Sequence, residues 1–460
     1  MNRPGPHNRP SRKSREPIPK TPREVALEAL YAVDRRHAFS DRLLHKLLRD
    51  HPMDARDAAM VTNIVRGTLR WQGRIDGLLN HYIKIGLDAL PPMIQNILRM
   101  GVFQMLYMDR IPPSAAVDES VKLAKKFGHP GTAGLVNAVL RKMVVEKDKL
   151  PEPRIGDNPA PALATIYSHP EWMISRWLRR FGLEETRELL DANNTPPPVT
   201  IRVNPNRTTR SEFLQRLHDM DLTAEIGERH ANTIKVNGDF APASVASFHE
   251  GLFTVQDESE SLVVDLLAPQ PGERIVDLCA APGGKTSQIS ELIGHGGLVL
   301  AVEGQKGRLK PLAENQARMS LTNAALVLAD GRNLELRKPV DRVLVDAPCS
   351  GLGVLAKRAD ARWRKTEASI RSIAVLQGEL LKAGATLVKP GGVLVYSVCS
   401  MEPEEGEQQV RQFLAAHPDW HLDDATAYLP ADMVTDGMML ILPHRHKMDG
   451  AFAARLVRKA

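Results

Sequence analysis

The feature that most restricts the fold of this 460-residue chain is a regular alternation that begins after Pro271. Short segments rich in β-branched residues alternate there with longer segments whose apolar residues recur at helical spacing. The pattern predicts strands at 274–278, 297–302, 324–328, 342–345 and 393–396, and helices at 286–293, 307–319 and 366–388. Such alternation predicts a parallel sheet with helices on both faces. Ligands of these sheets bind at the carboxyl ends of the strands.

The chain before this sheet divides into further regions. Residues 21–146 carry successive amphipathic patterns separated by proline-rich breaks, and predict an all-helical domain. The charged, proline-rich residues 147–166 predict a linker. Residues 167–250 combine a helical pattern with a strand-like run at 199–203, and predict a small α/β subdomain. The domain with the parallel sheet then occupies 251–460, in a multidomain fold of the α plus α/β class.

Positive charge is concentrated at the start of the chain. Residues 1–20 contain six basic side chains and one acidic side chain, so they contribute +5 of the net charge of +6. Their composition, rich in Pro, Arg and Ser, cannot bury an apolar core and predicts a disordered basic tail. Such a tail serves either to keep the protein soluble or to contact a polyanion such as RNA.

The remaining composition predicts a soluble, cytoplasmic protein without a membrane partner. No stretch of about twenty residues is free of charge, and the N-terminus has no apolar signal segment. Cys279, Cys349 and Cys399 are far apart and form no C-x-x-C pair, so we expect reduced thiols. No metal site is expected, because His444 and His446 are close in sequence but lack a third ligand.

A glycine-rich turn follows the first predicted strand of the sheet. The segment from Val276 to Thr286 reads VDLCAAPGGKT, and its small residues allow the backbone to approach a ligand closely. The next helix offers its N-terminal amides to an anionic group, so a nucleotide-like cofactor is expected. A P-loop is the competing interpretation, but the glycine that a P-loop needs five positions before Gly284 is Cys279 here.

Two acidic residues strengthen the expectation of a cofactor. Glu303 ends the second predicted strand, about twenty-five residues after the glycine turn, where an acid can accept both hydroxyls of a ribose. Asp330 follows the third strand and could lie near the adenine. Either acid alone could simply hydrate the end of a strand. Together with the glycine turn they predict a nucleoside pocket.

Two cysteines follow the last two predicted strands. Cys349 lies in Val345-Asp346-Ala347-Pro348-Cys349-Ser350-Gly351, and Cys399 lies in Tyr396-Ser397-Val398-Cys399-Ser400. A free cysteine is most often only a small apolar residue. Here, however, all three cysteines of the chain fall at transitions from strand to loop in one domain, which favours a chemical role.

The segments VDLCAAPGGKT, DAPCSGLGVL and YSVCSMEPEEGE resemble the signature motifs of the Sun/Nol/Nop family of RNA 5-methylcytosine methyltransferases. The C-terminal segment 442–452 is similar to that family's C-terminal hairpin, and the helical N-terminal region resembles NusB, an RNA-binding fold. The resemblance covers nearly all of residues 21–459. It implies a Rossmann-like class I methyltransferase domain with a mostly parallel, seven-stranded sheet, and S-adenosylmethionine as the cofactor.

The resemblance also implies roles for individual residues. Cys399 would be the nucleophile, Cys349 would assist product release, and Asp346 would hydrogen-bond to the target cytosine. The implied cofactor pocket is formed by Cys279, Ala280, Ala281, Pro282, Gly283, Gly284, Lys285, Glu303, Asp330 and Asp346. The chain departs from the family at Val398, where Thr is frequent, and at Glu303, where Asp is usual; neither change removes a needed functional group.

The implied chemistry explains why a cysteine is needed. Carbon 5 of cytosine is a weak nucleophile until a thiolate adds to carbon 6 of the ring. A free thiol has a pKa of about 8.5, so the site has to favour its deprotonated form. A DNA cytosine methyltransferase would use the Pro-Cys motif for the nucleophile, and a non-catalytic RNA-binding or antitermination factor would need neither cysteine. The second cysteine motif and the NusB-like region favour RNA methylation.

The expected partner is RNA. Within the family, a NusB-like domain ahead of the catalytic domain is the arrangement of bacterial enzymes that act on small-subunit (16S) ribosomal RNA, either free or in an assembling subunit. The protein is expected to act as a monomer. Candidates for holding the RNA combine cations with an aromatic ring that can stack on a base, and they are Arg202, Asn204, Lys357, Arg358, Arg362, Trp363 and Arg364.

Overall fold

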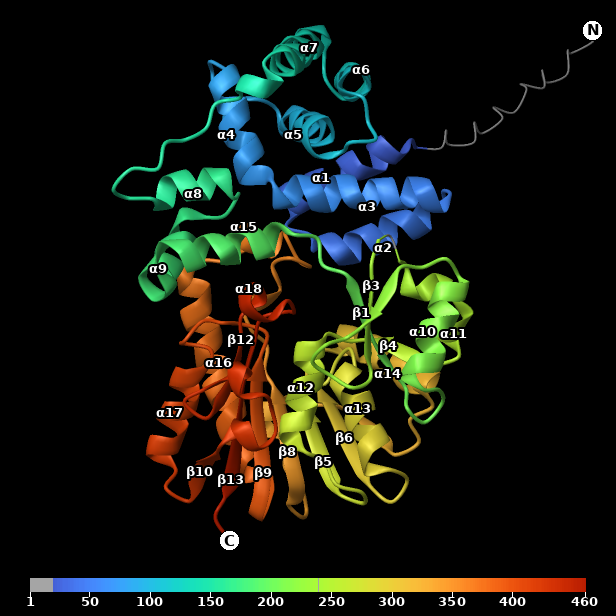
Figure 1. Cartoon of the computed structure of the whole chain (residues 1–460), viewed down its shortest axis with the longest axis vertical. Helices are drawn as coiled ribbons and strands as arrows, with labels where there is room; N and C mark the ends of the chain where they lie inside the picture. Colours follow the sequence, from blue (N-terminus) through green and yellow to red (C-terminus); the bar gives the residue numbers. More distant parts are fainter. Residues whose placement is uncertain (1–19, 239) are drawn as a thin grey trace, which may run out of the picture. The chain divides into compact units, whose positions relative to one another are not determined.

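The computed structural model describes residues 20–238 and 240–460 and divides the chain into two compact units (Figure 1). The first unit contains the chain up to Leu69 together with Leu79–Leu150, and the second contains Arg70–Leu78 together with Pro151–Ala460. The predicted basic tail lies, except for Lys20, outside the described residues. No helix in the described part of the chain is long and apolar enough to cross a membrane.

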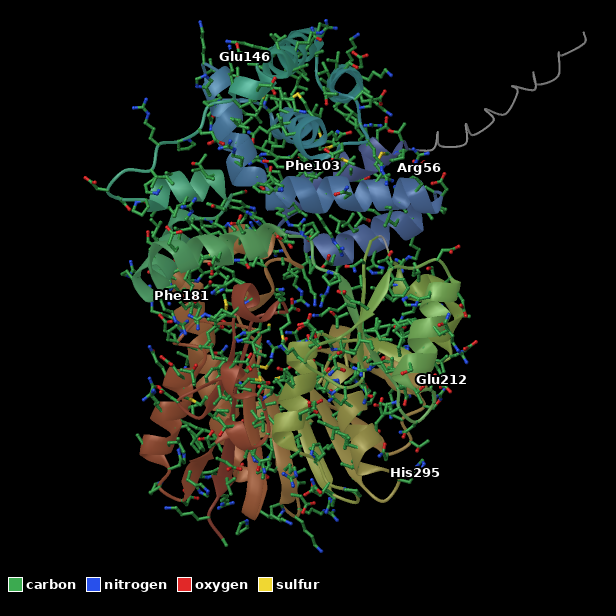
Figure 2. All side chains as sticks on the ribbon, viewed as in Figure 1. Arg56, Phe103, Glu146, Phe181, Glu212 and His295 are labelled. Atoms are coloured by element: carbon green, nitrogen blue, oxygen red, sulfur yellow. The ribbon has the colours of Figure 1, made fainter. Side chains whose placement is uncertain are left out.

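The first unit is helical, as predicted. Thr21 caps its first helix in a capping box with Glu24, and a proline stands in the first turn of several others, where the missing N–H costs no hydrogen bond. Phe103 (labelled in Figure 2) packs against Gly67, where a Cβ atom would meet its ring at 1.9 Å. The helices are α1 (Pro22–Arg36), α2 (Ser40–Asp50), α3 (Ala55–Arg70), the end of α4 (Gln72–Tyr82), α5 (Pro92–Tyr107), α6 (Pro113–Phe127) and α7 (Pro130–Val145).

The second unit begins, after the segment Arg70–Leu78, with two helices and a small antiparallel sheet of strand order β2-β3-β1-β4. One face of the sheet buries Ile201 and Val203 of β1 against Phe213 and Phe253. The elements are α8 (Ala160–Ile166), α9 (Glu171–Asn194), β1 (Val199–Val203), α10 (Arg210–Asp219), β2 (Ala224–Ile226), β3 (Thr233–Val236), α11 (Ala246–His249) and β4 (Phe253–Val255).

The large sheet of the second unit has strand order β11-β12-β13-β9-β8-β5-β6-β7, with β10 paired to β13. Its parallel strands are β5 (Arg274–Leu278), β6 (Leu298–Glu303), β7 (Ala324–Leu328), β8 (Val340–Asp346) and β9 (Val388–Val398). Antiparallel strands extend it: β10 (Trp420–Asp423), β11 (Val434–Thr435), β12 (Met438–Ile441) and β13 (Ala451–Arg458).

Helices cover both faces of this sheet, as Figure 1 shows. Because side chains alternate along a strand, Ile275 packs on one face with α12 and α13, while Val276 packs on the other face with α16. The helices of this domain are α12 (Glu258–Leu267), α13 (Gly284–Ile293), α14 (Lys306–Met319), α15 (Ala361–Arg364), α16 (Glu367–Thr386), α17 (Glu407–Ala416) and α18 (Pro443–His446).

The predicted fold class is confirmed, with corrections of detail. The large sheet has nine strands in the described residues, not seven, because short antiparallel strands join its edge. The predicted linker 147–166 contains helix α8, whose Ala160 and Leu163 are buried against α9. Strand β4 pairs with β1 of the small sheet, although the expected boundary at residue 250 assigned it to the next domain.

Candidate active site

The structure brings Cys349 and Cys399 together. Strands β8 and β9 are parallel neighbours, paired up to Asp346 and Ser397, so both cysteines lie just past the carboxyl edge of the sheet. Their sulfur atoms are 2.7 Å apart, both thiols are free, and both residues are of intermediate exposure. The two sulfur atoms therefore lie together at the edge where such sheets bind their ligands.

Asp346 connects the cysteines to the glycine turn. Its Oδ1 accepts a hydrogen bond from the Ser397 hydroxyl at 2.8 Å, and its Oδ2 accepts one from Lys285 Nζ at 3.0 Å. Burial opposes the charged form of Lys285, but Asp346, Glu260 and then Cys399 outweigh it, so the pKa of Lys285 is raised. A permanent positive charge thus lies close to Cys399.

The glycine turn has the shape of a cofactor cradle. Cys279 and Gly283 adopt positive φ angles of 63° and 105°, so the backbone turns sharply between β5 and α13. A Cβ atom on Gly283 would come within 2.8 Å of Leu312, so this backbone approach requires glycine. The turn places the N-terminus of α13 at the same sheet edge as the cysteines. The free amides at this helix N-terminus can bind the carboxylate of a ligand.

Two acids beside the turn have buried oxygens without a hydrogen-bond partner in the described structure: Oε2 of Glu303 and Oδ1 of Asp277. Glu303 is 2% exposed, and its other oxygen accepts from the amide of Gln305. Arg308 pairs with Glu303 Oε2 at 3.5 Å without a hydrogen bond, and a buried acceptor without a hydrogen bond costs about 1–3 kcal/mol, so both oxygens can accept from hydrogen-bond donors of a ligand. Ribose hydroxyls supply such donors, so these residues fit a nucleoside cofactor.

Electrostatics disfavours Cys279 as a nucleophile. Burial, followed by the charges of Asp346, Glu303 and Asp277, raises the pKa of Cys279 to about 12. Burial also raises the pKa of Asp277 to about 7. Cys279 is therefore a neutral thiol near neutral pH and is unsuited to be a nucleophile. Asp330, at the end of β7, is exposed, and its carboxylate pairs with Arg332 at 2.7 Å.

Glu405 is a residue of the site that the sequence reasoning missed. Its fully buried carboxylate accepts hydrogen bonds from the serines that follow each cysteine, Ser350 and Ser400. The only signal in the sequence is its place in the acidic segment MEPEEGE, six residues after Cys399. Such an acidic segment is typical of a solvent-exposed loop, so there was no reason in the sequence to expect that Glu405 is buried.

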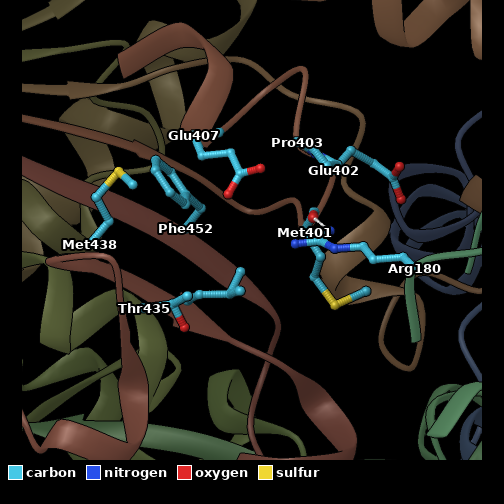
Figure 3. Close-up of a pocket in the computed structure, with 10 residues that line it drawn as sticks. Arg180, Met401, Glu402, Pro403, Glu407, Thr435, Met438 and Phe452 are labelled. Carbon is cyan, nitrogen blue, oxygen red and sulfur yellow. Dashed lines mark hydrogen bonds between the residues drawn. The ribbon is translucent and has the colours of Figure 1, made fainter. Parts of the chain in front are cut away.

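Ion pairs and hydrogen bonds join the loop after Cys399 to helix α9. Arg176 pairs with Glu402 and Glu404, each at 2.7 Å, and Trp177 Nε1 donates to Glu402 at 3.0 Å. Figure 3 shows Arg180 of the same helix donating to the carbonyl of Met401. The cavity drawn there measures about 10 Å³, which is room for no more than one water molecule. This region supports the loop and offers no space for a substrate.

Two of the residues expected to hold RNA, Arg202 and Asn204, are buried. Strand alternation places Arg202, 1% exposed, on the face of β1 that packs against α13, where it pairs with Glu291 and donates to Ser287 and Gln256. Asn204 donates to the carbonyl of Gly251. The expectation for these two residues is corrected, because their polar groups are already satisfied inside the second unit.

Lys357 and Arg362 also have structural partners. Lys357 donates to Asp257 at 2.5 Å and to Asp449 at 2.7 Å. Arg362 is fully buried, and burial followed by the charge of Arg70 lowers its pKa to about 9. The expectation that Arg362 holds RNA is corrected by its burial, whereas contact of the partly exposed Lys357 with RNA stays a prediction.

The guanidinium of Arg362 joins separate segments of the second unit. It donates to the carbonyls of Arg70, Ser168 and Asn193 and to the side chain of Asn194. Of the remaining RNA candidates, Arg358 is exposed, whereas Trp363 and Arg364 are partly buried.

The C-terminal histidines make separate contacts. His444 pairs with Glu185 at 2.9 Å, while His446 accepts from the amide of Leu442 and contacts the carbonyl of Asp432. In residues 20–238 and 240–460, no group of three or more His, Cys, Asp or Glu side chains could hold a metal ion.

A mixed sheet that carries at one edge a glycine turn, acids able to bind ribose hydroxyls and two adjacent free cysteines defines a Rossmann-like methyltransferase domain. The model of the family "16S rRNA methyltransferase RsmB/F" matches residues 264–457. The model of the ferredoxin-like domain of RsmF/B-like methyltransferases matches 169–241, and the NusB family model matches 20–145.

Curated relatives match over nearly their whole length. The chain is 37% identical to the probable ribosomal RNA small subunit methyltransferase B of Synechocystis sp., over 94% of this chain and 98% of the relative. It is 34% identical to the corresponding Bacillus subtilis protein, over 95% and 98%. The crystal structure of PH0851 is 28% identical, covers 96% of this chain and 100% of its own, and superposes with a TM-score of 0.78.

The chain therefore belongs to the ribosomal RNA small subunit methyltransferase B family. The resemblance inferred from the cysteine motifs and the NusB-like region is confirmed. The protein is an rRNA methyltransferase.

Proposed function

We propose that this protein transfers a methyl group from S-adenosylmethionine to carbon 5 of one cytosine in 16S ribosomal RNA, through a transient bond from Cys399. The observation that carries the proposal is the 2.7 Å approach of the Cys349 and Cys399 sulfurs beside the Lys285–Asp346 pair. The names of the relatives, ribosomal RNA small subunit methyltransferase B, support the choice of RNA.

Binding of the cofactor falls to the glycine turn and its neighbours. Glu303 and Asp277 would accept hydrogen bonds from a nucleoside, and the amides at the start of α13 would receive a carboxylate. The residues 279–285 let the backbone come close without side chains in the way. When bound, the cofactor supplies an electrophilic methyl group.

The chemistry on the base begins with Cys399. Its thiolate adds to carbon 6 of the cytosine, N3 takes up a proton from solvent, and the resulting enamine makes carbon 5 nucleophilic enough to bond to the methyl group as the methyl–sulfur bond of the cofactor breaks. Asp346, in the role proposed for it, would accept hydrogen bonds from the protonated N3 and the exocyclic amine and stabilise the altered ring. A base next removes the proton from carbon 5, and the electrons of that C–H bond re-form the double bond as the bond from carbon 6 to sulfur breaks.

Lys285 supplies a fixed cation beside the cysteines. Its ammonium group donates to Asp346 at 3.0 Å, and the charges of Asp346, Glu260 and Cys399 raise its pKa against the effect of burial.

The test of the proposal is bisulfite sequencing of total RNA from cells with and without this gene. We expect one cytosine of 16S ribosomal RNA to be protected from conversion only when the gene is present, and purified protein with S-adenosylmethionine to restore that protection. Unchanged protection patterns, together with no binding of the cofactor in a titration, would leave the chain as an RNA-binding assembly factor.

The helical unit offers a surface for the RNA. A groove of about 710 Å³ runs between α6 and α7, and its charged lining residues are Lys122, Lys125, Arg141 and one acid, Asp118. The lining residues are Asp118, Val121, Lys122, Lys125, Gly128, His129, Pro130, Ala133, Gly134, Asn137 and Arg141. Basic side chains around a groove favour the phosphates of a nucleic acid over a neutral ligand.

Reversing two charges in this groove is expected to weaken RNA binding. The double variant Lys125→Glu and Arg141→Glu should raise the Kd for a 16S fragment roughly tenfold or more and reduce the salt dependence by about two phosphate contacts. Filter binding at several salt concentrations measures both. The matched control reverses the exposed Lys46 and Arg56 of the same unit; equal losses in both pairs would contradict a role specific to the groove.

A further inference from the structure

The loops that carry the two cysteines extend beyond the hydrogen-bonded part of the sheet. The pairing of β8 with β9 ends at Asp346 and Ser397, one further backbone bond joins Ala347 to Ser397, and the amide of Gly353 donates to the carbonyl of Cys399 at 3.1 Å. These backbone bonds hold the second loop at Ser397 and Cys399. A side-chain contact at the residues next to both cysteines would restrict the positions of the sulfur atoms further.

The buried carboxylate of Glu405 provides that contact. Its Oε1 accepts from the amide of Ser350 at 2.7 Å and from Gln377 Nε2 at 3.1 Å. Its Oε2 accepts from the hydroxyls of Ser350 and Ser400, which lie 3.1 Å from each other. One carboxylate thus binds the residue directly after each cysteine.

Glu405 is itself firmly held. Its carbonyl accepts from the Tyr396 hydroxyl of β9 at 2.6 Å, and its amide donates to the carbonyl of Glu402. Gln377 belongs to α16, so the carboxylate is also tied to the helix layer of the sheet. Hydrogen bonds to a charged acceptor are stronger in a buried setting, so this cross-link resists the small displacements that loops otherwise make.

We propose that Glu405 is a positioning residue that sets the separation and orientation of Cys399 and Cys349 for the methyl-transfer reaction. The inference rests on the proposed function of the two cysteines. It assigns Glu405 no contact with RNA or cofactor, and its effect passes through Ser350 and Ser400. Catalytic groups need placement within about 0.5 Å, and an error of about 1 Å costs on the order of 100-fold in rate.

The charge of Glu405 adds a second effect. The pKa of Cys349 is raised well above its usual range, first by its hydrogen bond to Cys399, then by burial, by the charge of Cys399 and by Glu405. Glu405 thus helps to keep Cys349 protonated. In residues 20–238 and 240–460, Glu405 forms no ion pair. A buried carboxylate satisfied only by neutral donors is a costly way to join two loops for stability alone.

Two substitutions separate geometry from charge. Glu405→Gln keeps the length and can still accept at one atom, while its amide can donate to the serine hydroxyls, so kcat is expected to fall less than about tenfold. Glu405→Ala removes the cross-link, and kcat is expected to fall by roughly 100-fold with KM for RNA within about threefold. Glu407→Gln removes a neighbouring carboxylate two residues away and should behave like the wild type.

The readouts are single-turnover methylation of a 16S fragment, a titration with S-adenosylmethionine, and the rate of iodoacetamide labelling of Cys399 and Cys349 followed by mass spectrometry. Glu405→Ala should bind the cofactor normally yet label Cys349 at a lower pH than the wild type. A merely structural role would change the melting temperature without changing the labelling pH.

If Glu405→Ala does not fold, Ser400→Ala removes the hydroxyl that joins the second loop to Glu405, and Ser350→Ala removes a hydroxyl of the first loop but keeps its backbone amide bond; kcat should fall by at least about fivefold in Ser400→Ala and by less in Ser350→Ala. Wild-type kcat in Glu405→Ala, or in both serine variants, would overturn the inference. A wild-type protein that fails to methylate RNA would instead overturn the proposed function, so the two failures are distinguishable.

Discussion

Replacing Cys399 with alanine is expected to abolish methyl transfer to 16S ribosomal RNA, with a loss in rate of at least about 10³-fold. The reason is that carbon 5 of cytosine cannot attack a methyl group until a nucleophile has added to carbon 6. Cys279 cannot replace Cys399 in this step, since burial and the nearby acids raise its pKa to about 12. The measurement is incorporation of labelled methyl groups into a 16S fragment.

The control for this variant is cofactor binding. Within residues 20–238 and 240–460 no hydrogen bond joins Cys399 to the glycine turn or to Glu303, so the affinity of Cys399→Ala for S-adenosylmethionine should remain within about threefold of the wild type. Cys279→Ala removes a different thiol of the same domain and should retain measurable turnover. An active Cys399→Ala protein would refute the covalent route. If Cys399→Ala also fails to bind the cofactor, its lower rate cannot be assigned to the missing nucleophile.

Replacing Cys349 with alanine is expected to have the opposite consequence for the covalent bond: a protein–RNA adduct should accumulate and survive denaturing electrophoresis. The hydrogen bond and the charge of Cys399 both contribute to the raised pKa of Cys349. Both contributions disappear once Cys399 is bonded to the base, so the pKa of Cys349 falls when a proton acceptor is needed at carbon 5. Without Cys349, methyl transfer can proceed but release is slowed.

The adduct is measured as a slowly migrating band of labelled RNA, formed in the presence of S-adenosylmethionine. The double variant, with both Cys349 and Cys399 changed to alanine, should form no band, because the bonding sulfur is gone. If Cys349→Ala releases product at the wild-type rate with no adduct, water serves as the base and Cys349 only packs against its neighbour.

The central part of the fold could be predicted because its pattern is local. The predicted strands 274–278 and 324–328 agree with β5 and β7 residue for residue, since buried parallel strands are short, apolar and rich in β-branched residues. The antiparallel edge was missed because β10 and β11 are short and partly polar, and β10 pairs with a strand about thirty residues away. Helix α4 was missed for a similar reason: Gln72, Arg74 and Asp76 interrupt its apolar pattern.

The sequence predicts those parts of the site that directly follow a strand, because the ends of the strands fix their position. Both cysteines were expected at the sheet edge, and the geometry places their sulfurs in contact. The charge of a side chain does not show whether that side chain points to the solvent or into the protein. Arg202 is a basic residue that would suit RNA, yet its partner Glu291 lies 89 positions away on α13, a pairing that no local pattern reveals. Glu405 escaped detection for the converse reason, because its neutral partners come from three separate elements.

The second unit is discontinuous in sequence, and this limits how the protein can be divided. Residues 70–78 belong to it although the residues on either side of them belong to the helical unit. Arg362 uses the carbonyl of Arg70, and the amide of Gly73 donates to Ser168 at 2.8 Å. A fragment that starts at Pro151 would lack the Arg70 carbonyl and the Gly73 amide, and Arg362 would keep only its acceptors at Ser168, Asn193 and Asn194. Excision of the methyltransferase half by one cut therefore yields an incomplete molecule, and only a fragment that retains this early insertion preserves its full set of internal bonds.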